Sequence, residues 1–210
     1  MEIRVESLSK TFRGAQVLEN INYTFTSGKI YGLAGKNGSG KTMLLREIAG
    51  LIHPTSGQVL IDGKQLHQDL SFPPSMGLII EKPEFLGDMS GFENLKMLAS
   101  IRKIVTDKQI KAWMYRFSLA PDSKQPMRKY SMGMKQKIGI IQAVMEDPEL
   151  LILDEPFNAL DEESVHLCWS ILKTLRQAGK LIIITSHHKE DIEQLCDNTL
   201  LMENGRCIEI

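Results

Sequence analysis

Residues 35–42, with the sequence GKNGSGKT, have the types and the spacing that bind phosphate. They fit the pattern G-x-x-x-x-G-K-[ST], whose glycines allow several backbone N–H groups to turn toward one anion. The Lys41 ammonium is expected to reach the outer phosphates of a nucleotide, and the Thr42 hydroxyl is expected to bind Mg²⁺. The residues assigned to this phosphate loop are Gly35, Lys36, Asn37, Gly38, Ser39, Gly40, Lys41 and Thr42.

A pair of carboxylates follows the apolar run 150–153. Such a run predicts a buried strand, and the residue after it lies at the carboxyl edge of the sheet, where α/β proteins bind ligands. Asp154 is therefore expected to hold Mg²⁺ through water, and Glu155 to orient the water that attacks the terminal phosphate. An isolated Asp-Glu pair is more often a solvated turn, but the apolar run and the phosphate loop together favour the catalytic interpretation.

The sequence gives only a weak signal for how the base of the nucleotide is bound. The base-reading motif N-K-x-D is absent, so a Ras-like GTPase is disfavoured. Phe12 is a candidate to stack on a purine ring, and ordinary packing is the alternative for this side chain.

The elements that must position these residues alternate between strands and helices. Patterns of buried strands over residues 29–35, 150–154 and 180–185, with helical segments between them, predict a parallel sheet covered on both faces. The phosphate loop lies between the first of these strands and a short helix over 41–50 that Gly50 closes. Further strands are predicted over 76–80 and 198–202, with a closing turn at 204–206.

Two other regions differ from this parallel core. Alternation of apolar and polar residues predicts half-buried antiparallel strands over 2–8 and 21–28, and a strand with an Asp-Gly turn over 57–64. From residue 92 to residue 146 the periodicity is helical, with Asp107 and Ser131 as expected helix starts. The architecture is therefore an α/β core interrupted by a mainly helical lobe.

The bulk composition excludes several classes of protein. The chain has 210 residues, 42% hydrophobic and 24% charged, which suits one soluble globular domain. Its net charge of −1 argues against non-specific nucleic-acid binding. The amino terminus has no signal-peptide pattern, and every apolar run is far shorter than the roughly 20 residues that span a bilayer. The three cysteines show no CxxC spacing, which predicts a reducing compartment and no zinc site.

The stretch 129–161, KYSMGMKQKIGIIQAVMEDPELLILDEPFNALD, resembles the ABC ATPase family. In that family an LSGGQ-like signature precedes the Walker B strand by one helix, and a D-loop follows the strand. Here YSMGM stands at the signature, LLILDEP at Walker B, NALD at the D-loop, and ITSH at the switch histidine. The resemblance extends over nearly the whole chain, from Phe12 to the final strand.

The resemblance implies an α/β P-loop NTPase fold of ABC-cassette type, with a RecA-like parallel core, an antiparallel β subdomain and an inserted helical subdomain. Residues 1–210 would form one ABC ATPase domain, with the core and antiparallel parts at about 1–82 and 148–210 and the helical subdomain at about 83–147. Its ligands would be ATP and Mg²⁺.

The resemblance also assigns residues across a dimer. Ser131 and Gly133 would bind the γ-phosphate held by a second ATPase subunit, since a helix start has unsatisfied N–H groups. His187 would contact the γ-phosphate as a catalytic residue, and Asp161 would act across the dimer seam. The second subunit is expected to be an identical copy, and a related chain is the alternative.

Three departures from the family pattern matter. Met132 and Met134 replace the usual glycine and glutamine of the signature, while its serine and second glycine are kept. Met43 stands where a second hydroxyl residue is usual, so one contact to the α-phosphate is lost while the backbone N–H remains. Glu81 stands at the position of the Q-loop glutamine, as a nucleotide and Mg²⁺ ligand that also lies where the family meets its membrane partner.

The expected function is that of an ATP-binding and ATP-hydrolysing subunit of an ABC transporter, cytoplasmic and peripheral on the inner face of the cell membrane. It would act on a separate integral membrane permease, without nucleic acid and without inserting into the membrane. The stretch LIIEKPEFLGDMSGFENL resembles the branch that serves lantibiotic and bacitracin-type export or immunity. The alternatives are a soluble ABC ATPase with a non-transport client and a P-loop kinase, which would not need a signature motif.

Overall fold

A six-stranded sheet forms the centre of the molecule in the computed structural model, which describes all 210 residues. Its order is β10-β9-β3-β8-β7-β6, and every neighbouring pair is parallel except β10 with β9. The parallel arrangement predicted from the apolar runs is confirmed. The strands are β3 (Ile30–Ala34), β6 (Met76–Ile79), β7 (Leu150–Leu153), β8 (Leu181–Thr185), β9 (Asn198–Glu203) and β10 (Arg206–Glu209).

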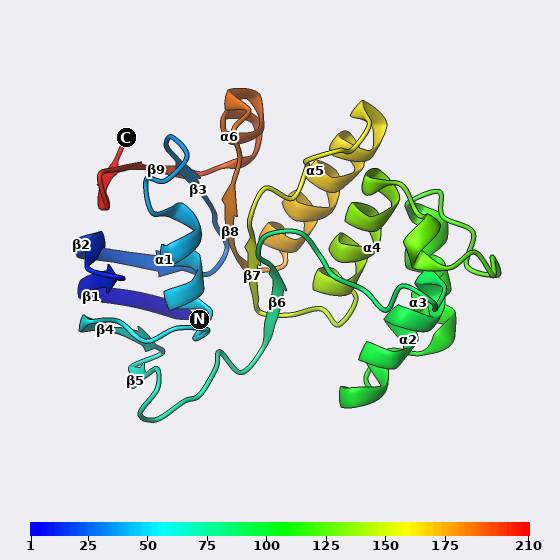
Figure 1. The fold of residues 1–210 in the computed structure, drawn as a ribbon, viewed down its shortest axis with the longest axis horizontal. Coiled ribbons are helices and arrows are strands. Elements are labelled where there is room, and N and C mark those ends of the chain that lie inside the picture. Colours follow the sequence, from blue (N-terminus) through cyan, green and yellow to red (C-terminus); the bar gives the residue numbers. More distant parts are fainter.

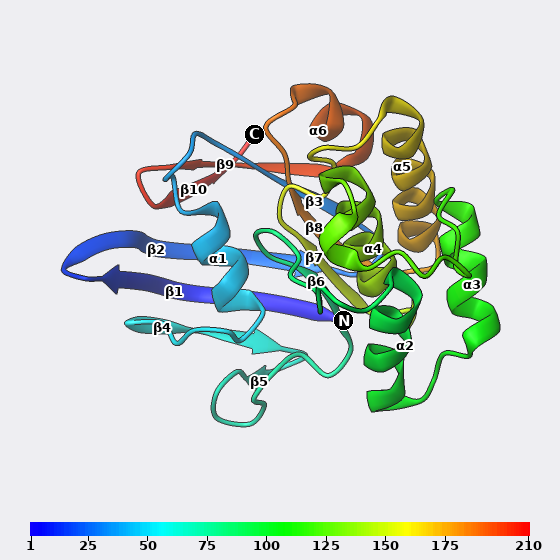
Figure 2. The same ribbon diagram turned by 45° about the vertical axis from the view of Figure 1, so that its right-hand side comes forward.

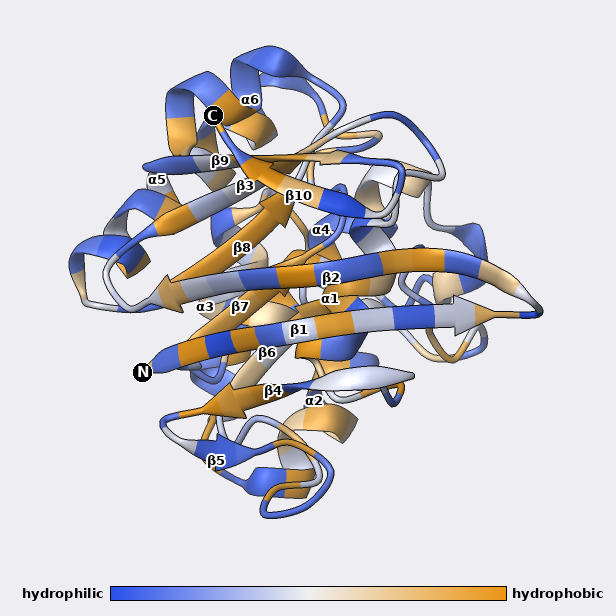
Figure 3. Ribbon diagram, turned by 90° about the vertical axis from the view of Figure 1, so that its left-hand side faces the viewer, coloured by the Kyte–Doolittle hydropathy of each residue, from blue (hydrophilic) through white to orange (hydrophobic).

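A second sheet of four antiparallel strands, in the order β2-β1-β4-β5, lies beside the first (Figures 1 and 2). Figure 3 shows the alternation of polar and apolar residues along β1 and β2, which agrees with strands that are buried on one face only. The strands are β1 (Glu2–Phe12), β2 (Ala15–Thr26), β4 (Ser56–Ile61) and β5 (Lys64–Gln65).

Helices cover both faces of the parallel sheet. Helix α1 lies between the two sheets, and the remaining helices lie on the other side of the parallel sheet (Figure 1). Neighbouring residues of one strand face opposite cores: Ile152 packs on the α1 side and Leu151 on the side of the other helices. The helices are α1 (Lys41–Ile48), α2 (Gly91–Arg102), α3 (Asp107–Arg116), α4 (Met132–Val144), α5 (Glu162–Gln177) and α6 (Lys189–Leu195), with a 3₁₀ turn at Met127–Lys129.

Local capping explains where the helices of the lobe begin. Ser90 and Thr106 each form a capping box with the residue three positions later, before α2 and α3. The Ser131 hydroxyl accepts a hydrogen bond from the Met134 backbone N–H at the start of α4. The helix starts expected at Asp107 and Ser131 are therefore confirmed, with Thr106 as the cap of α3.

The expected parallel core, antiparallel sheet and inserted helical lobe are all present, and the differences concern strand lengths. β1 and β2 extend well beyond residues 2–8 and 21–28, because they pair along their full lengths in one long hairpin. β5 and β10 are short edge strands that periodicity did not predict. The division into subdomains near residues 82 and 147 stays a prediction. None of the helices is both long and apolar enough to cross a lipid bilayer.

Candidate functional site

The phosphate loop connects the end of β3 to the first turn of α1. Gly35 has φ +143°, and a Cβ there would lie 2.4 Å from the carbonyl oxygen of Met202. Gly40, the N-cap of α1, has φ +106° in the left-handed region. Both positions need glycine, because a side chain would be strained at either and would clash at Gly35. The sequence pattern thus has a direct structural cause.

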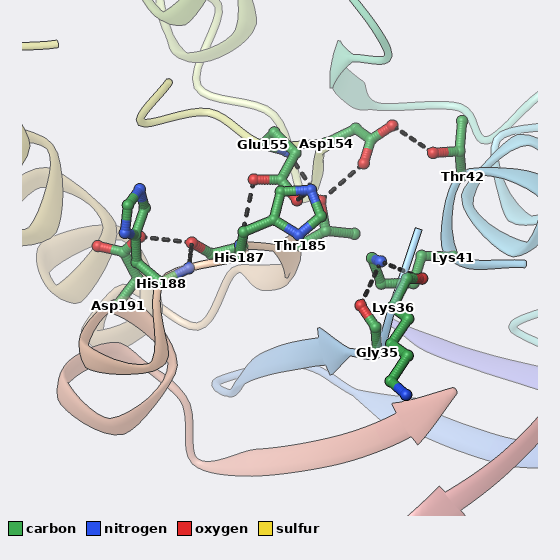
Figure 4. Close-up of polar contacts among 11 residues, drawn as sticks. Gly35, Lys36, Lys41, Thr42, Asp154, Glu155, Thr185, His187, His188 and Asp191 are labelled. Atoms are coloured by element: carbon green, nitrogen blue, oxygen red, sulfur yellow. Dashed lines mark hydrogen bonds and ion pairs between the residues drawn. The ribbon is translucent and has the colours of Figure 1, made fainter. Parts of the chain in front are cut away.

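Lys41 is directed back into the loop rather than to solvent. Its ammonium donates hydrogen bonds to the carbonyl oxygens of Gly35 (2.7 Å) and Lys36 (3.1 Å), as Figure 4 shows. An ammonium has three donors, so one remains for a ligand. The buried hydroxyl of Ser39 has no partner of its own. The loop therefore offers a cation and an unused hydroxyl to an anion.

Asp154, directly after β7, is held at both carboxylate oxygens. Thr42 donates to Oδ2 at 2.7 Å, and Thr185 donates to Oδ1 at 2.6 Å. The Thr185 hydroxyl also accepts from the backbone N–H of Glu155 at 2.8 Å (Figure 4). Sequence reasoning missed Thr185, although a lone polar residue at the end of the apolar strand β8 was a usable signal.

Glu155 and His187 face each other across the carboxyl edge of the sheet. His187 Nε2 lies 3.0 Å from Oε1 of Glu155, an ion-pair distance, while no group donates a hydrogen bond to that oxygen. The His187 backbone N–H donates to Oε2 at 3.2 Å. Burial raises the pKa of the Glu155 carboxyl above its ordinary value, and the His187 ring opposes part of that rise.

A hollow of about 270 Å³, here the catalytic hollow, joins these groups. It brings half of the residues predicted to bind the nucleotide together with both predicted catalytic residues. Val17 of β2 is an unpredicted neighbour. The hollow is lined by Val17, Asn37, Gly38, Ser39, Gly40, Lys41, Thr42, Met43, Asp154, Glu155 and His187.

Phe12 is not among the residues that line the catalytic hollow. It ends β1 at the hairpin with β2, and its ring is half exposed, with the Arg13 guanidinium 5.5 Å from the ring centre. The part of the hairpin that borders the phosphate loop is Val17, whose carbonyl oxygen lies 3.0 Å from where a Gly40 Cβ would be. Stacking of Phe12 on a base stays a prediction.

Ser131 and Gly133 also lie outside the catalytic hollow. Gly133 packs against the loop after Glu155, since a Cβ there would lie 2.6 Å from the carbonyl oxygen of Ala159. One turn later, Gln136 donates to the carbonyl oxygen of Pro156 at 2.8 Å. The start of α4 thus packs against the loop that follows Asp154 and Glu155.

The Asp161 carboxylate has hydrogen-bond and ion-pair partners within its own chain. It caps α5 by accepting from the backbone N–H of Ser164 at 2.9 Å, and its other oxygen lies 3.2 Å from the Lys137 ammonium. The hydrogen bonds from Ser164, with help from Lys137, lower the pKa of Asp161 to about 2. A role across a dimer seam stays a prediction.

Glu81 lies beyond β6 with its carboxylate directed at α1. Its Oε1 is 2.5 Å from Nη2 of Arg46, and its backbone has φ +61°, unusual for a residue with a side chain. It is absent from the lining of the catalytic hollow but lines a neighbouring hollow of about 320 Å³ with Asp154 and Glu155. That neighbouring space is called the side hollow below.

The oxygen donors present fit a magnesium ion that is held mainly by nucleotide phosphates and water. Thr42 and Asp154 offer a hydroxyl and a largely buried carboxylate, the hard oxygens that Mg²⁺ prefers. No group of three or more His, Cys, Asp or Glu side chains is arranged to hold a metal ion. This sparse set is typical of Mg²⁺ sites that share the ion with phosphates rather than of protein-only cages.

Comparison with known proteins agrees with this site. A family model described as "ABC transporter" matches residues 18–158. The chain is 50% identical over 204 residues to the uncharacterized ABC transporter ATP-binding protein YybJ of Bacillus subtilis (strain 168), covering 97% of this chain and 94% of YybJ.

Two more distant relatives carry names that state what they transport. The bacitracin transport ATP-binding protein BcrA of Enterococcus faecalis is 37% identical over 209 residues, covering 99% of this chain and 68% of BcrA. The lantibiotic transport ATP-binding protein SrtF of Streptococcus pyogenes is 31% identical over 207 residues, covering 98% of this chain and 89% of SrtF.

Solved structures share the fold. An ATP-binding subunit of an ABC transporter superposes with a TM-score of 0.91 at 26% identity, covering 100% of this chain and 90% of that one. The cassette MJ0796, solved as a dimer in a post-hydrolysis state with ADP and Pi, gives 0.88 at 20% identity and covers 99% of this chain and 97% of that one.

Proposed function

The chain belongs to the ABC transporter family, and from this premise we propose that it binds Mg²⁺-ATP and splits it to power a separate membrane permease. The observation that carries the proposal is the catalytic hollow, where a phosphate loop faces Asp154, Glu155 and His187. An ATPase needs a phosphate grip and a water-activating carboxylate in the same hollow, and both are present here.

The phosphate loop would hold the triphosphate by charge and by backbone dipoles. The Lys41 ammonium, which makes two hydrogen bonds within the loop, would give its third donor to the outer phosphates, and the N-terminus of α1 favours negative charge. Thr42 and Asp154 would hold Mg²⁺, which when bound neutralises charge on the phosphates. Met43 contributes only its backbone N–H.

Glu155 is the group placed to take a proton from the attacking water. Its raised pKa makes the carboxylate a better base, while Thr185 and His187 fix its position from two sides. The imidazole of His187 is half exposed and remains available to donate to the terminal phosphate. These residues supply positioning and proton transfer.

A second copy of the chain would complete the site. Ser131 and Gly133 lie outside the catalytic hollow, yet the start of α4 has unsatisfied N–H groups that suit an anion. The exposed position of Met132 leaves that helix start open to a neighbouring molecule. ATP would then be held between two chains, gripped by one and covered by the other.

The permease is proposed to dock in a hollow of about 430 Å³ between α1 and α4, here the groove. Its lining combines apolar side chains such as Leu51 and Ile52 with the charged side chains of Arg46, Glu81 and Lys82. A mixed lining of this kind suits a protein segment with one apolar face. Docking there would place the chain on the inner face of the cell membrane.

The cargo is proposed to be an antimicrobial peptide of the bacitracin or lantibiotic type. Support comes from the two relatives named for such transport. Cargo would be selected by the permease.

The proposal is tested with the Glu155→Gln and Lys41→Ala variants. Glu155→Gln should bind Mg²⁺-ATP without turnover and sediment as a dimer in the ultracentrifuge, whereas Lys41→Ala should lose nucleotide affinity. A Glu155→Gln chain that stays monomeric at saturating Mg²⁺-ATP, even with its membrane partner, would refute the two-copy site. Identification of the proteins that co-purify with the tagged chain in mild detergent tests the permease.

A further inference from the structure

One face of α1 contacts two carboxylates that follow different strands of the sheet. Thr42 contacts Asp154, after β7, at 2.7 Å, and Arg46 contacts Glu81, after β6, at 2.5 Å. Thr42 and Arg46 are four residues apart, so they lie one turn apart on the same side of the helix. The helix that begins at the phosphate loop therefore contacts both the proposed metal ligand and Glu81.

Glu81 borders two different spaces. It lines the groove together with Arg46, and it lines the side hollow together with Asp154 and Glu155. The side chain is 65% exposed, so packing does not fix its direction. Its carboxylate therefore has a cationic partner in the groove, Arg46, and borders on its other side the space next to Asp154, where a metal ion would bind.

We propose that Arg46 is a positioning residue for the ATPase reaction: by pairing with Glu81 it holds this carboxylate in the groove and away from Mg²⁺. The inference rests on the proposed function, since it concerns the same metal site. A planar guanidinium suits a carboxylate geometrically, and Mg²⁺ accepts carboxylate oxygens as ligands. Glu81 lines the groove with Arg46 and the side hollow with Asp154, so loss of its partner in the groove would favour the position on the Asp154 side.

The exposure of this pair sets the size of the effect. Ion pairs that solvent reaches are weak, so Arg46 biases the position of Glu81 and does not lock it. Releasing Glu81 should therefore tighten metal binding by about twofold to fivefold rather than by orders of magnitude. A glutamine at position 81 would carry no charge for Arg46 to hold, so the effect depends on the carboxylate found in this chain.

The test is a double-mutant cycle on metal affinity. Arg46→Met removes the charge and the donors while keeping most of the aliphatic stem, and Glu81→Gln removes the charge of the carboxylate. Mn²⁺ replaces Mg²⁺ as the probe, and its binding to each full-length variant with a non-hydrolysable ATP analogue is followed by electron paramagnetic resonance. Thermal unfolding curves check that every variant is folded.

Arg46→Met is expected to tighten Mn²⁺ binding by about twofold to fivefold in the wild-type background and to give no gain in the Glu81→Gln background. Arg46→Lys, which keeps the charge, should give a smaller gain than Arg46→Met. An equal gain in Mn²⁺ affinity in both backgrounds would mean that Arg46 acts only as a nearby charge. This result would overturn the inference about Arg46 and leave the proposed function standing. No gain in either background overturns the inference as well. A wild-type chain that binds no ATP analogue overturns the proposed function, and this inference with it.

Discussion

His187 contacts both oxygens of the Glu155 carboxylate, with its ring Nε2 3.0 Å from Oε1 and its backbone N–H 3.2 Å from Oε2. The backbone contact fixes the carboxylate whatever the state of the ring. The ring is therefore free to change partner when a nucleotide arrives, without releasing Glu155. In the proposed mechanism, the backbone of His187 would hold Glu155 while the ring contacts the phosphate.

Glu155→Gln should lower kcat by about 100-fold or more while nucleotide binding is kept. Glutamine has nearly the same shape but does not accept a proton from water. Phosphate release and nucleotide affinity are the measurements. Glu163→Gln, an exposed acid in the first turn of α5, is the matched control and should keep kcat. Equal rates in the two variants would remove Glu155 from the chemistry.

The pH profile should respond to His187. Burial raises the pKa of Glu155 and the His187 ring lowers it, so His187→Ala should raise that pKa further. Activity needs the ionised carboxylate, so the acid limb of kcat against pH should move to higher pH in this variant. His188→Ala is the control, because its backbone N–H contacts Ser186 rather than Glu155. An acid limb that moves to lower pH, or not at all, would contradict the assigned interaction.

Thr185→Val should remove the hydroxyl that links Asp154 to the backbone of Glu155. The hydroxyl that it removes donates to Asp154 and accepts from the Glu155 backbone, so both groups would lose a partner inside the fold. Leaving such groups unpaired costs about 1–3 kcal/mol, and we expect kcat to fall with the free energy of unfolding. Urea unfolding and kinetics are the measurements, with Thr185→Ser as the rescue. Equal stability and rate in the valine variant would show that the hydroxyl is dispensable.

Glu47 should make the stability of the fold depend on pH. It lies on α1, fully buried, and neither carboxylate oxygen has a hydrogen-bond partner, although the Lys10 ammonium is 3.9 Å from Oε1. Burial raises its pKa from 4.5 to about 7, with Lys10 opposing the rise. The folded chain therefore holds a proton that the unfolded chain releases. This contribution to stability is complete below about pH 4.5 and is lost as the pH rises through about 7.

Glu47→Gln removes this titration. A shift from 4.5 to about 7 corresponds to roughly 3 kcal/mol at about 1.4 kcal/mol per pKa unit, so the variant should gain stability relative to wild type between pH 5 and pH 8. Urea unfolding at both pH values measures the difference. A constant difference between the variant and the wild type across this range would show that Glu47 keeps an ordinary pKa.

The parts of the site that local pattern determines were predictable. The phosphate loop, Asp154 and Glu155 each follow a strand directly, so sequence order alone places them at the sheet edge. Thr185 stands out in the sequence as the polar end of the apolar strand β8, but its contact with Asp154 was not predictable, because that contact depends on β8 lying next to β7 in the sheet. The Arg46–Glu81 contact joins residues 35 positions apart and depends on how far α1 reaches along the sheet.

For the fold as well, local sequence patterns were predictable and contacts between distant segments were not. Core strands were found because burial on both faces makes them apolar throughout, as in β8. The outer halves of β1 and β2 are polar on one face and largely exposed, and only pairing with each other makes them strands. Likewise, Phe12 lies at the end of that hairpin and is absent from the lining of the catalytic hollow, and the length of the hairpin is what periodicity underestimates.

The packing of Gly133 on Ala159 has a consequence for two copies acting together. In the proposed pair, the tip of α4 covers the neighbour's ATP while its own flank rests on the loop that leaves Glu155. A change in that loop after hydrolysis would therefore displace the cover over the opposite nucleotide. Hydrolysis at one site would in this way affect the other site through the protein, so the two sites could hydrolyse ATP alternately. This coupling would require no contact between the two nucleotides.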